Sequence, residues 1–114
     1  KQICAKPIGR ALWPLADTED HWDALVLRSF ATIDGVRTAY QEGPVTTMLA
    51  PADLIARYRE AGGKFEDGTL MFCGTLAVHG GVRPADRFEI EVHDPARART
   101  LAHAYDIEVL PNVG

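Results

Sequence analysis

Gly74 and Thr75 are the residues whose types and position first suggest binding chemistry. They follow the apolar run of residues 70–73, which we expect to be a strand. A glycine at such a point lets a ligand approach the backbone, and the threonine beside it offers a hydroxyl group. Strand glycines often mark only a bulge or a packing contact, so on these two residues alone we favour the structural interpretation.

Two glutamates and two lysines are weaker candidates. Glu89 and Glu91 alternate along a predicted strand, so their carboxylates share one face and could hold a hard cation such as Mg²⁺. The solvated face of an antiparallel strand explains the same alternation, and we favour that interpretation. Lys1 or Lys6 could stabilise an oxyanion if it lay desolvated beside a pocket. Lysines at chain ends and in loops are ordinarily solvated, so their spacing alone assigns them no function.

The four histidines form no familiar metal or nucleophile motif. None lies at H-x-x-x-H spacing or pairs with a cysteine at zinc-site spacing. The glycines after His79 lack the lysine and hydroxyl residue of a phosphate loop, and there is no G-x-S-x-G elbow. One hypothesis that the histidines leave open is a cupin-like metal site using His79 and His93.

Composition excludes several classes of function. The net charge is −4 and the basic residues are scattered singly, so we expect no nucleic-acid binding, which needs a concentrated positive surface. No apolar run approaches the ~20 residues that span a bilayer, and there is no secretory signal, so we expect no membrane association. Only Cys4 and Cys73 are present, which favours reduced thiols in a cytoplasmic protein.

The elements that must position these residues belong to one domain, residues 1–114. Asp34-Gly35 suits a type I′ turn and predicts a hairpin within residues 24–40. Pro51 suits the first helical position and Gly62-Gly63 a C-terminal cap, which predicts one amphipathic helix near 51–61. We expect residues 1–14 to be irregular, and residues 17–23, which are acidic and polar, to form a solvated loop.

The remaining residues alternate in the manner of strands. We predict a turn at Asp67-Gly68, a strand over residues 69–76, a turn over 83–86 and a strand through Phe88, Ile90 and Val92 that ends at Asp94-Pro95. A last strand is marked by four residues, Leu101, Tyr105, Ile107 and Val109. A lone helix among strands does not give a repeating βαβ pattern, so we expect a mostly-β (α+β) fold.

These segments resemble the fumarylacetoacetate hydrolase-like (FAH-like) superfamily. The run F-E-D-G-T-L-M-F-C-G-T-L at residues 65–76 resembles its "L-x-P-G-D-x-I-x-T-G-T-P" signature, and R-P-A-D-R-F-E-I-E at 83–91 resembles the following "K-P-G-D-x-V-E-V-E-I". Upstream, L-V-L-R at 25–28, Q-E-G at 41–43, Met48 and A-D-L-I-A at 52–56 are similar to "L-x-L-R…Q-x-G…M…A-E-L-I-A". The resemblance covers nearly the whole chain in order and is closest to a bacterial branch catalogued as a domain of unknown function.

The resemblance implies a mixed β-sandwich roll, a homodimer, and an enzyme that acts on small 2-oxo or β-dicarbonyl acids. The implied reactions are C–C hydrolysis, decarboxylation or dehydration, assisted by Mg²⁺ or Mn²⁺. Lys1, followed by P-I-G at residues 7–9, matches the active-site lysine. Gly74 and Thr75 match the substrate-contacting "T-G-T" turn, and Gln41 matches the loop that borders the pocket.

The resemblance also implies that part of the site lies elsewhere. In the FAH-like family the metal-binding carboxylates precede the lysine in sequence, so no metal ligand is expected within this chain. The chain thus resembles a C-terminal portion of the catalytic domain. We expect this portion to be inactive alone. Four residues depart from the family pattern: Cys73 and Leu76 in the turn, and Pro44-Val45 after Gln41. The alternative hypothesis is therefore a non-catalytic β-roll module for binding or assembly.

Overall fold

The computed structural model describes residues 6–111, and its central feature is the predicted hairpin. Strand β1 (Val26–Ile33) pairs antiparallel with β2 (Val36–Pro44). The turn residues Asp34 and Gly35 have φ angles of 50° and 77°. Two successive positive φ angles are those of a type I′ turn, so this prediction is confirmed.

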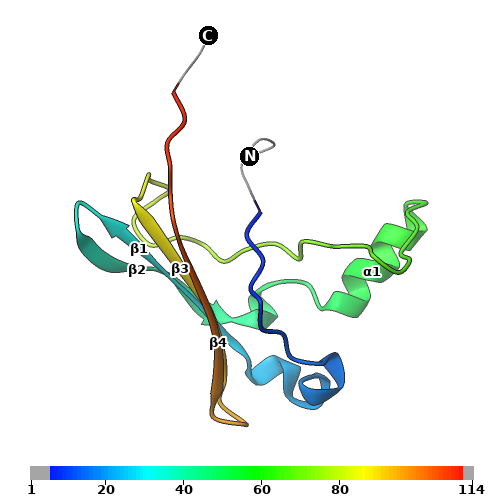
Figure 1. Cartoon of the computed structure of the whole chain (residues 1–114). Coiled ribbons are helices and arrows are strands. Elements are labelled where there is room, and N and C mark those ends of the chain that lie inside the picture. The colour runs from blue at the N-terminus through cyan, green and yellow to red at the C-terminus, as the bar shows by residue number, and fades with distance from the viewer. Residues whose placement is uncertain (1–5, 112–114) are drawn as a thin grey trace.

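Two later strands complete one antiparallel sheet in the order β2-β1-β3-β4 (Figure 1). β3 (Arg87–Asp94) pairs with β1 and ends where Asp94-Pro95 was predicted to end it, and β4 (Arg99–Asp106) pairs with β3. β4 stops short of Ile107 and Val109, which were expected within it. The mostly-β class is confirmed. The described residues form a single sheet with antiparallel pairings throughout, and the mixed β-sandwich roll that the resemblance implies stays a prediction.

The sheet has two chemically different faces, which follow from the strand registers. Side chains alternate between faces along a strand, and paired residues share a face. The inner face is mainly apolar and carries Leu27, Ser29, Ala31, Phe88, Ile90, Val92, Leu101, His103 and Tyr105. The outer face carries Arg28, Phe30, Glu89, Glu91 and His93.

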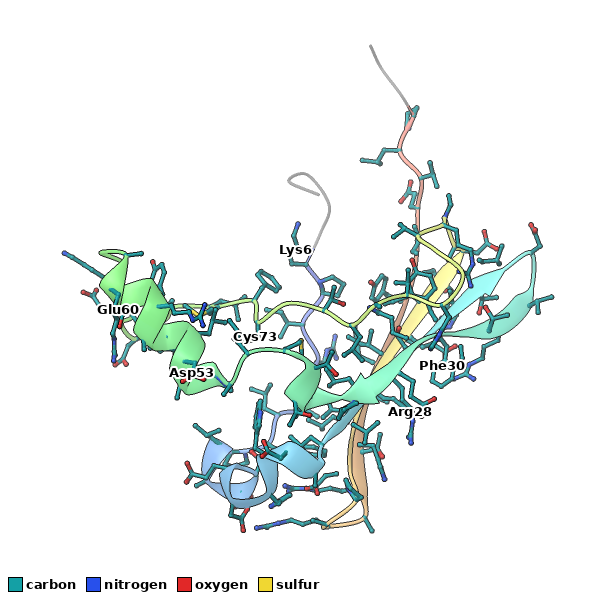
Figure 2. All side chains as sticks on the ribbon, turned by 180° about the vertical axis from the view of Figure 1, so that it is seen from behind. Lys6, Arg28, Phe30, Asp53, Glu60 and Cys73 are labelled. Carbon is teal, nitrogen blue, oxygen red and sulfur yellow. The ribbon has the colours of Figure 1, made fainter. Side chains whose placement is uncertain are left out.

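The outer face is a network of ion pairs. The Arg28 guanidinium lies 3.0 Å from a Glu42 carboxylate oxygen and 3.1 Å from one of Glu91, while Arg37 lies 2.8 Å from Glu89. In Figure 2 the Arg28 side chain projects from the sheet, whereas Cys73 lies on the long loop between the helix and β3. Both glutamates of the E-x-E pair are thus engaged with arginines, which supports the solvent-face interpretation.

Helix α1 (Pro51–Glu60) forms where Pro51 and the glycine pair predicted it. Gly62 has a φ of +87°, which suits the left-handed conformation that closes many helices. The helix stands apart from the sheet (Figure 1) and buries none of its residues. Its apolar residues Leu54 and Ile55 are only half-buried.

Residues 69–76, predicted as a strand, instead form an extended loop, the crossing loop, which passes over the sheet without joining its hydrogen-bond ladder. Gly74 has a φ of +107°, outside the range of a strand. Just beyond these residues, a backbone bond to the sheet runs from the His79 N–H to the Tyr40 carbonyl at 2.8 Å. The alternating apolar residues were therefore misleading, since Leu70 and Phe72 are 63% and 69% exposed.

Residues 17–23, predicted as a solvated loop, are folded. Two 3₁₀ helices, η1 (Leu15–Asp17) and η2 (Glu19–Ala24), bring this segment against the β3–β4 turn, and a third, η3 (Val45–Thr47), follows β2. Thr18 is buried, and its hydroxyl donates to the Leu15 carbonyl. Its acidic residues Glu19, Asp20 and Asp23 are exposed, as in a loop, and the long-range side-chain contact that holds the segment is the one from His21 to Asp94.

The chain has a small core and an open shape. Its buried apolar residues are Leu25, Ala31, Tyr40, Val45 and Leu76. The accessible surface is 8653 Å², compared with about 6,200 Å² for a compact monomer of this mass. The radius of gyration is 16.1 Å, compared with about 13 Å for a compact domain of this length. Much apolar surface therefore remains uncovered.

Candidate functional site

A cavity of about 410 Å³ lies over the inner face of the sheet. Its floor is apolar and comes from three strands, with Leu27 on β1, Ile90 and Val92 on β3, and Leu101 on β4. One wall is formed by the crossing loop at Gly74, Thr75 and Leu76, and Gly9 and Ala11 of the N-terminal segment complete it. The volume suits a small molecule.

The side chain of Gln41 joins the crossing loop to the sheet. Its Nε2 donates to the Thr75 hydroxyl oxygen at 2.8 Å and to the Leu76 carbonyl at 2.6 Å, while its Oε1 accepts from the Ser29 hydroxyl at 2.8 Å. The Leu76 carbonyl can only accept, so the amide orientation is fixed by chemistry. A bulge between Ser29 and Phe30 makes this possible, because the extra residue Tyr40 enters the core beside Gln41.

Thr75 is thereby prepared as a hydrogen-bond donor. Its oxygen already accepts from Gln41, so its own proton is left to point elsewhere. The residue is exposed and lines the cavity rather than packing in the core. A ligand carbonyl or carboxylate oxygen is the natural acceptor for such a hydroxyl.

The structure thus brings together three of the residues singled out from the sequence, Gln41, Gly74 and Thr75, at one cavity. Gly74 supplies the positive φ angle that turns the loop into the cavity wall. Leu76 stands where the FAH-like pattern has proline. It is 7% exposed and packs against Gly43, so it is a core residue. Lys1 lies outside the described residues.

His103 is a cavity residue that sequence reasoning missed. It lies on β4 on the inner face, opposite Ile90, and its ring contacts that of Tyr105 at 6.2 Å between centroids. Burial raises the pKa of Tyr105, which keeps its phenol neutral. The alternation of Leu101, His103 and Tyr105 could have indicated one shared face, but only the strand register shows that this face lines the cavity.

A second polar cluster lies at the C-terminal end of β3, around Asp94. The Asp94 side chain has no exposed surface and accepts from His21 Nε2 at 3.0 Å, from Arg99 Nε at 2.8 Å and from the Arg97 N–H at 3.2 Å. The other ring nitrogen of His21 bonds to Asp20. Arg99 also donates to the Asp17 carbonyl at 2.9 Å.

These contacts shift the acidities of the cluster. Burial raises the pKa of Asp94, but the hydrogen bonds from His21, Arg99 and Arg97 outweigh it and hold the pKa at about 2. Hydrogen bonds to Asp94 first and Asp20 second raise the pKa of His21. Because both imidazole nitrogens face carboxylates, the protonated form of His21 is favoured, and the ring has no free nitrogen for acid–base catalysis. The cluster ties the N-terminal segment to the β3–β4 turn.

The described residues do not fit a divalent metal ion. Among residues 6–111, no group of three or more His, Cys, Asp or Glu side chains is placed to hold one. Glu89 and Glu91 are neutralised by arginines. His79 and His93 belong to no such group, so the cupin-like hypothesis gains no support from the described residues, and one ring nitrogen of His93 is hydrogen-bonded to the Thr100 hydroxyl.

The fold and cavity define a small, β-rich domain with a small-molecule-sized site on one face of an antiparallel sheet. Residues 1–105 match the model of a family described as "Protein of unknown function (DUF2848)", and the chain belongs to this family. Neither the search of curated proteins nor that of solved structures found a match. Nothing in these comparisons connects the family with FAH-like proteins. In the part of the chain that the structure describes, no helix combines the length and apolarity needed to cross a membrane.

Proposed function

We propose that this chain supplies the substrate-binding wall of a hydrolase or lyase that acts on small 2-oxo or β-dicarbonyl acids. The observation that carries the proposal is the convergence of Gln41 with Gly74 and Thr75. Gln41 and Thr75 are 34 positions apart in the sequence, yet their side chains are hydrogen-bonded to each other at one cavity. The motif resemblance selected the same residues without reference to the structure.

The chemistry of the cavity is consistent with an oxo acid. The Thr75 hydroxyl can donate to a carbonyl or carboxylate oxygen, while Leu27, Ile90, Val92 and Leu101 accommodate a short carbon chain. The Gln41 amide contributes by holding Thr75 in place rather than by binding ligand, since its hydrogen-bonding atoms are already engaged. Thr75 is thus a preorganised donor, which reduces the entropic cost of binding.

The resemblance implies Mg²⁺ or Mn²⁺, which would polarise the paired oxygens of the substrate when bound. The described residues do not hold such an ion, so its ligands would come from outside residues 6–111. Lys1 remains a prediction of the resemblance, as the group that stabilises negative charge. The activity therefore belongs to the complete protein in which this chain occurs.

Thr75 substitutions test the proposal. In the complete protein, assayed with Mg²⁺ or Mn²⁺ against oxaloacetate and acylpyruvates, Thr75→Val should lower kcat/KM by roughly tenfold to a hundredfold, since a hydrogen bond to a charged group contributes ~1.5–3 kcal/mol. Thr75→Ser keeps the hydroxyl and should retain most activity. Equal activity of the Val and Ser variants would refute the role of Thr75.

The open shape of the chain gives the alternative hypothesis some support. Apolar side chains such as Leu12, Phe72 and Val82 are 80%, 69% and 88% exposed, as is common on surfaces that bind another protein. A non-catalytic module would bind oxo acids without metal-dependent turnover, or bind none at all. The same assay separates these outcomes from those expected of an enzyme.

A further inference from the structure

One rung of the sheet crosses the floor of the cavity from side to side. Gln41 on β2 pairs with Ser29 on β1, Ser29 with Ile90 on β3, and Ile90 with His103 on β4. Neighbouring strands are ~4.8 Å apart, so Gln41 and His103 are separated by roughly 14 Å between backbones. Thr75 is hydrogen-bonded to Gln41, at one end of this rung, and His103 is at the other.

The middle of the rung is apolar and both of its ends are polar. Ile90, together with Leu27, Val92 and Leu101 on the next rung, separates the Thr75 hydroxyl from the His103 imidazole. The two charged residues of the cavity rim, Arg28 and Glu91, belong to the outer face and are paired with each other at 3.1 Å. Among the cavity-lining residues of the described range 6–111, His103 is thus the ionisable side chain on the inner face.

His103 is also uncommitted. Among the described residues its ring makes the contact with Tyr105 and no hydrogen bond, unlike His21 and His93, whose ring nitrogens bond to Asp94 and Thr100. An imidazole offers an N–H donor in either tautomer and a second donor when protonated. Such a group at a cavity wall is suited to an oxygen-bearing, anionic ligand group.

We propose that His103 binds the far end of the ligand, and that the cavity takes oxo acids carrying a second carboxylate separated from the first by an apolar chain. This inference rests on the proposed function, since it deepens the substrate class of the same cavity. Thr75 holds the oxo-acid end, the apolar floor holds the chain, and His103 holds the distal carboxylate. Ligands with a plain alkyl end lose the third of these contacts.

Matched pairs of acids test this directly. We would measure dissociation constants by calorimetry for 2-oxoadipate against 2-oxohexanoate and for 2-oxopimelate against 2-oxoheptanoate, using the complete protein. In the wild type, at least one diacid should bind about tenfold more tightly than its partner, as expected for a charge-assisted hydrogen bond. His103→Phe should remove that advantage and leave monoacid binding within about twofold, because the ring is kept and the donor is lost.

His93→Phe is the matched control, since His93 lies on the outer face of the adjacent strand and should leave the advantage intact. If His103→Phe folds poorly, His103→Gln replaces it and should retain part of the advantage through its amide donor. A shift of the His103 ring resonances by the diacid but not the monoacid is the corresponding wild-type measurement.

The outcomes distinguish the two proposals. Monoacid binding that depends on Thr75, without any diacid preference, would overturn the role of His103 and leave the proposed function standing. Equal weakening of both acids by His103→Phe would also overturn it, because it would indicate a structural role. Failure of every acid to bind the wild type would overturn both.

Discussion

Removing the Gln41 amide should release the crossing loop from the sheet. In Gln41→Ala, three hydrogen bonds disappear, namely those with Ser29, Thr75 and Leu76. Each contributes ~0.5–1.5 kcal/mol, and the Thr75 bond is exposed, so we expect the free energy of unfolding to fall by about 2 kcal/mol. For a domain of this length that corresponds to a fall of about 8 °C in Tm.

The assay is urea unfolding combined with amide hydrogen exchange. Exchange should accelerate at His79, whose N–H bonds to Tyr40 and anchors the end of the loop, while the β1–β3 ladder keeps its protection. Glu42→Ala is the matched control. Its side chain points to the outer face and pairs with Arg28 in solvent, so the loop should stay protected. Unchanged stability and unchanged His79 exchange in Gln41→Ala would refute the view that this amide positions Thr75.

Two further predictions concern the Asp94 cluster and the uncovered surface. The pKa of Asp94 is lowered from 3.8 to about 2, so its stabilising effect should be present above pH 3.8 and lost as the pH falls toward 2. The pKa of His21 is raised from 6.5, so its effect should be complete below pH 6.5 and lost as the pH rises through the raised value. In Asp94→Asn, Tm should therefore depend less on pH, both on the acidic side and above pH 6.5. A pH profile of Tm identical to that of the wild type would contradict the pairing of Asp94 with His21. The chain exposes roughly 2,400 Å² more than a compact monomer would, and either the rest of the complete protein or a second copy must cover this surface. Because the resemblance implies a homodimer, the complete protein should be dimeric by light scattering, and a monomer at micromolar concentration would contradict this.

The elements that the sequence predicts well are those set by local backbone chemistry. Asp34-Gly35 requires positive φ angles, and Pro51 and Gly62 suit the two ends of a helix, so the hairpin and α1 could be placed without tertiary information. The crossing loop could not be placed in this way. Its alternating residues satisfy a strand pattern, but a side chain from β2 holds it instead of a ladder.

Two features of the sites depend on long-range pairing and were missed for that reason. His21 and Asp94 are 73 positions apart, and the acidic surroundings of His21 indicated only solvent. His103 faces the cavity because four strands align in one register, which is a property of the whole sheet. Motif similarity singled out Gln41, Gly74 and Thr75 because those residues lie within continuous signatures; the structure brings them to one cavity, and their role in binding stays a prediction.

The most direct measurement is a crystal structure of the complete protein with Mg²⁺ and 2-oxoadipate. The account predicts a ligand oxygen within hydrogen-bonding distance of the Thr75 hydroxyl, the carbon chain over Ile90, and metal ligands contributed from outside residues 6–111. An acid bound away from this cavity, or a Mg²⁺ ion ligated entirely by side chains of the described residues, would contradict it.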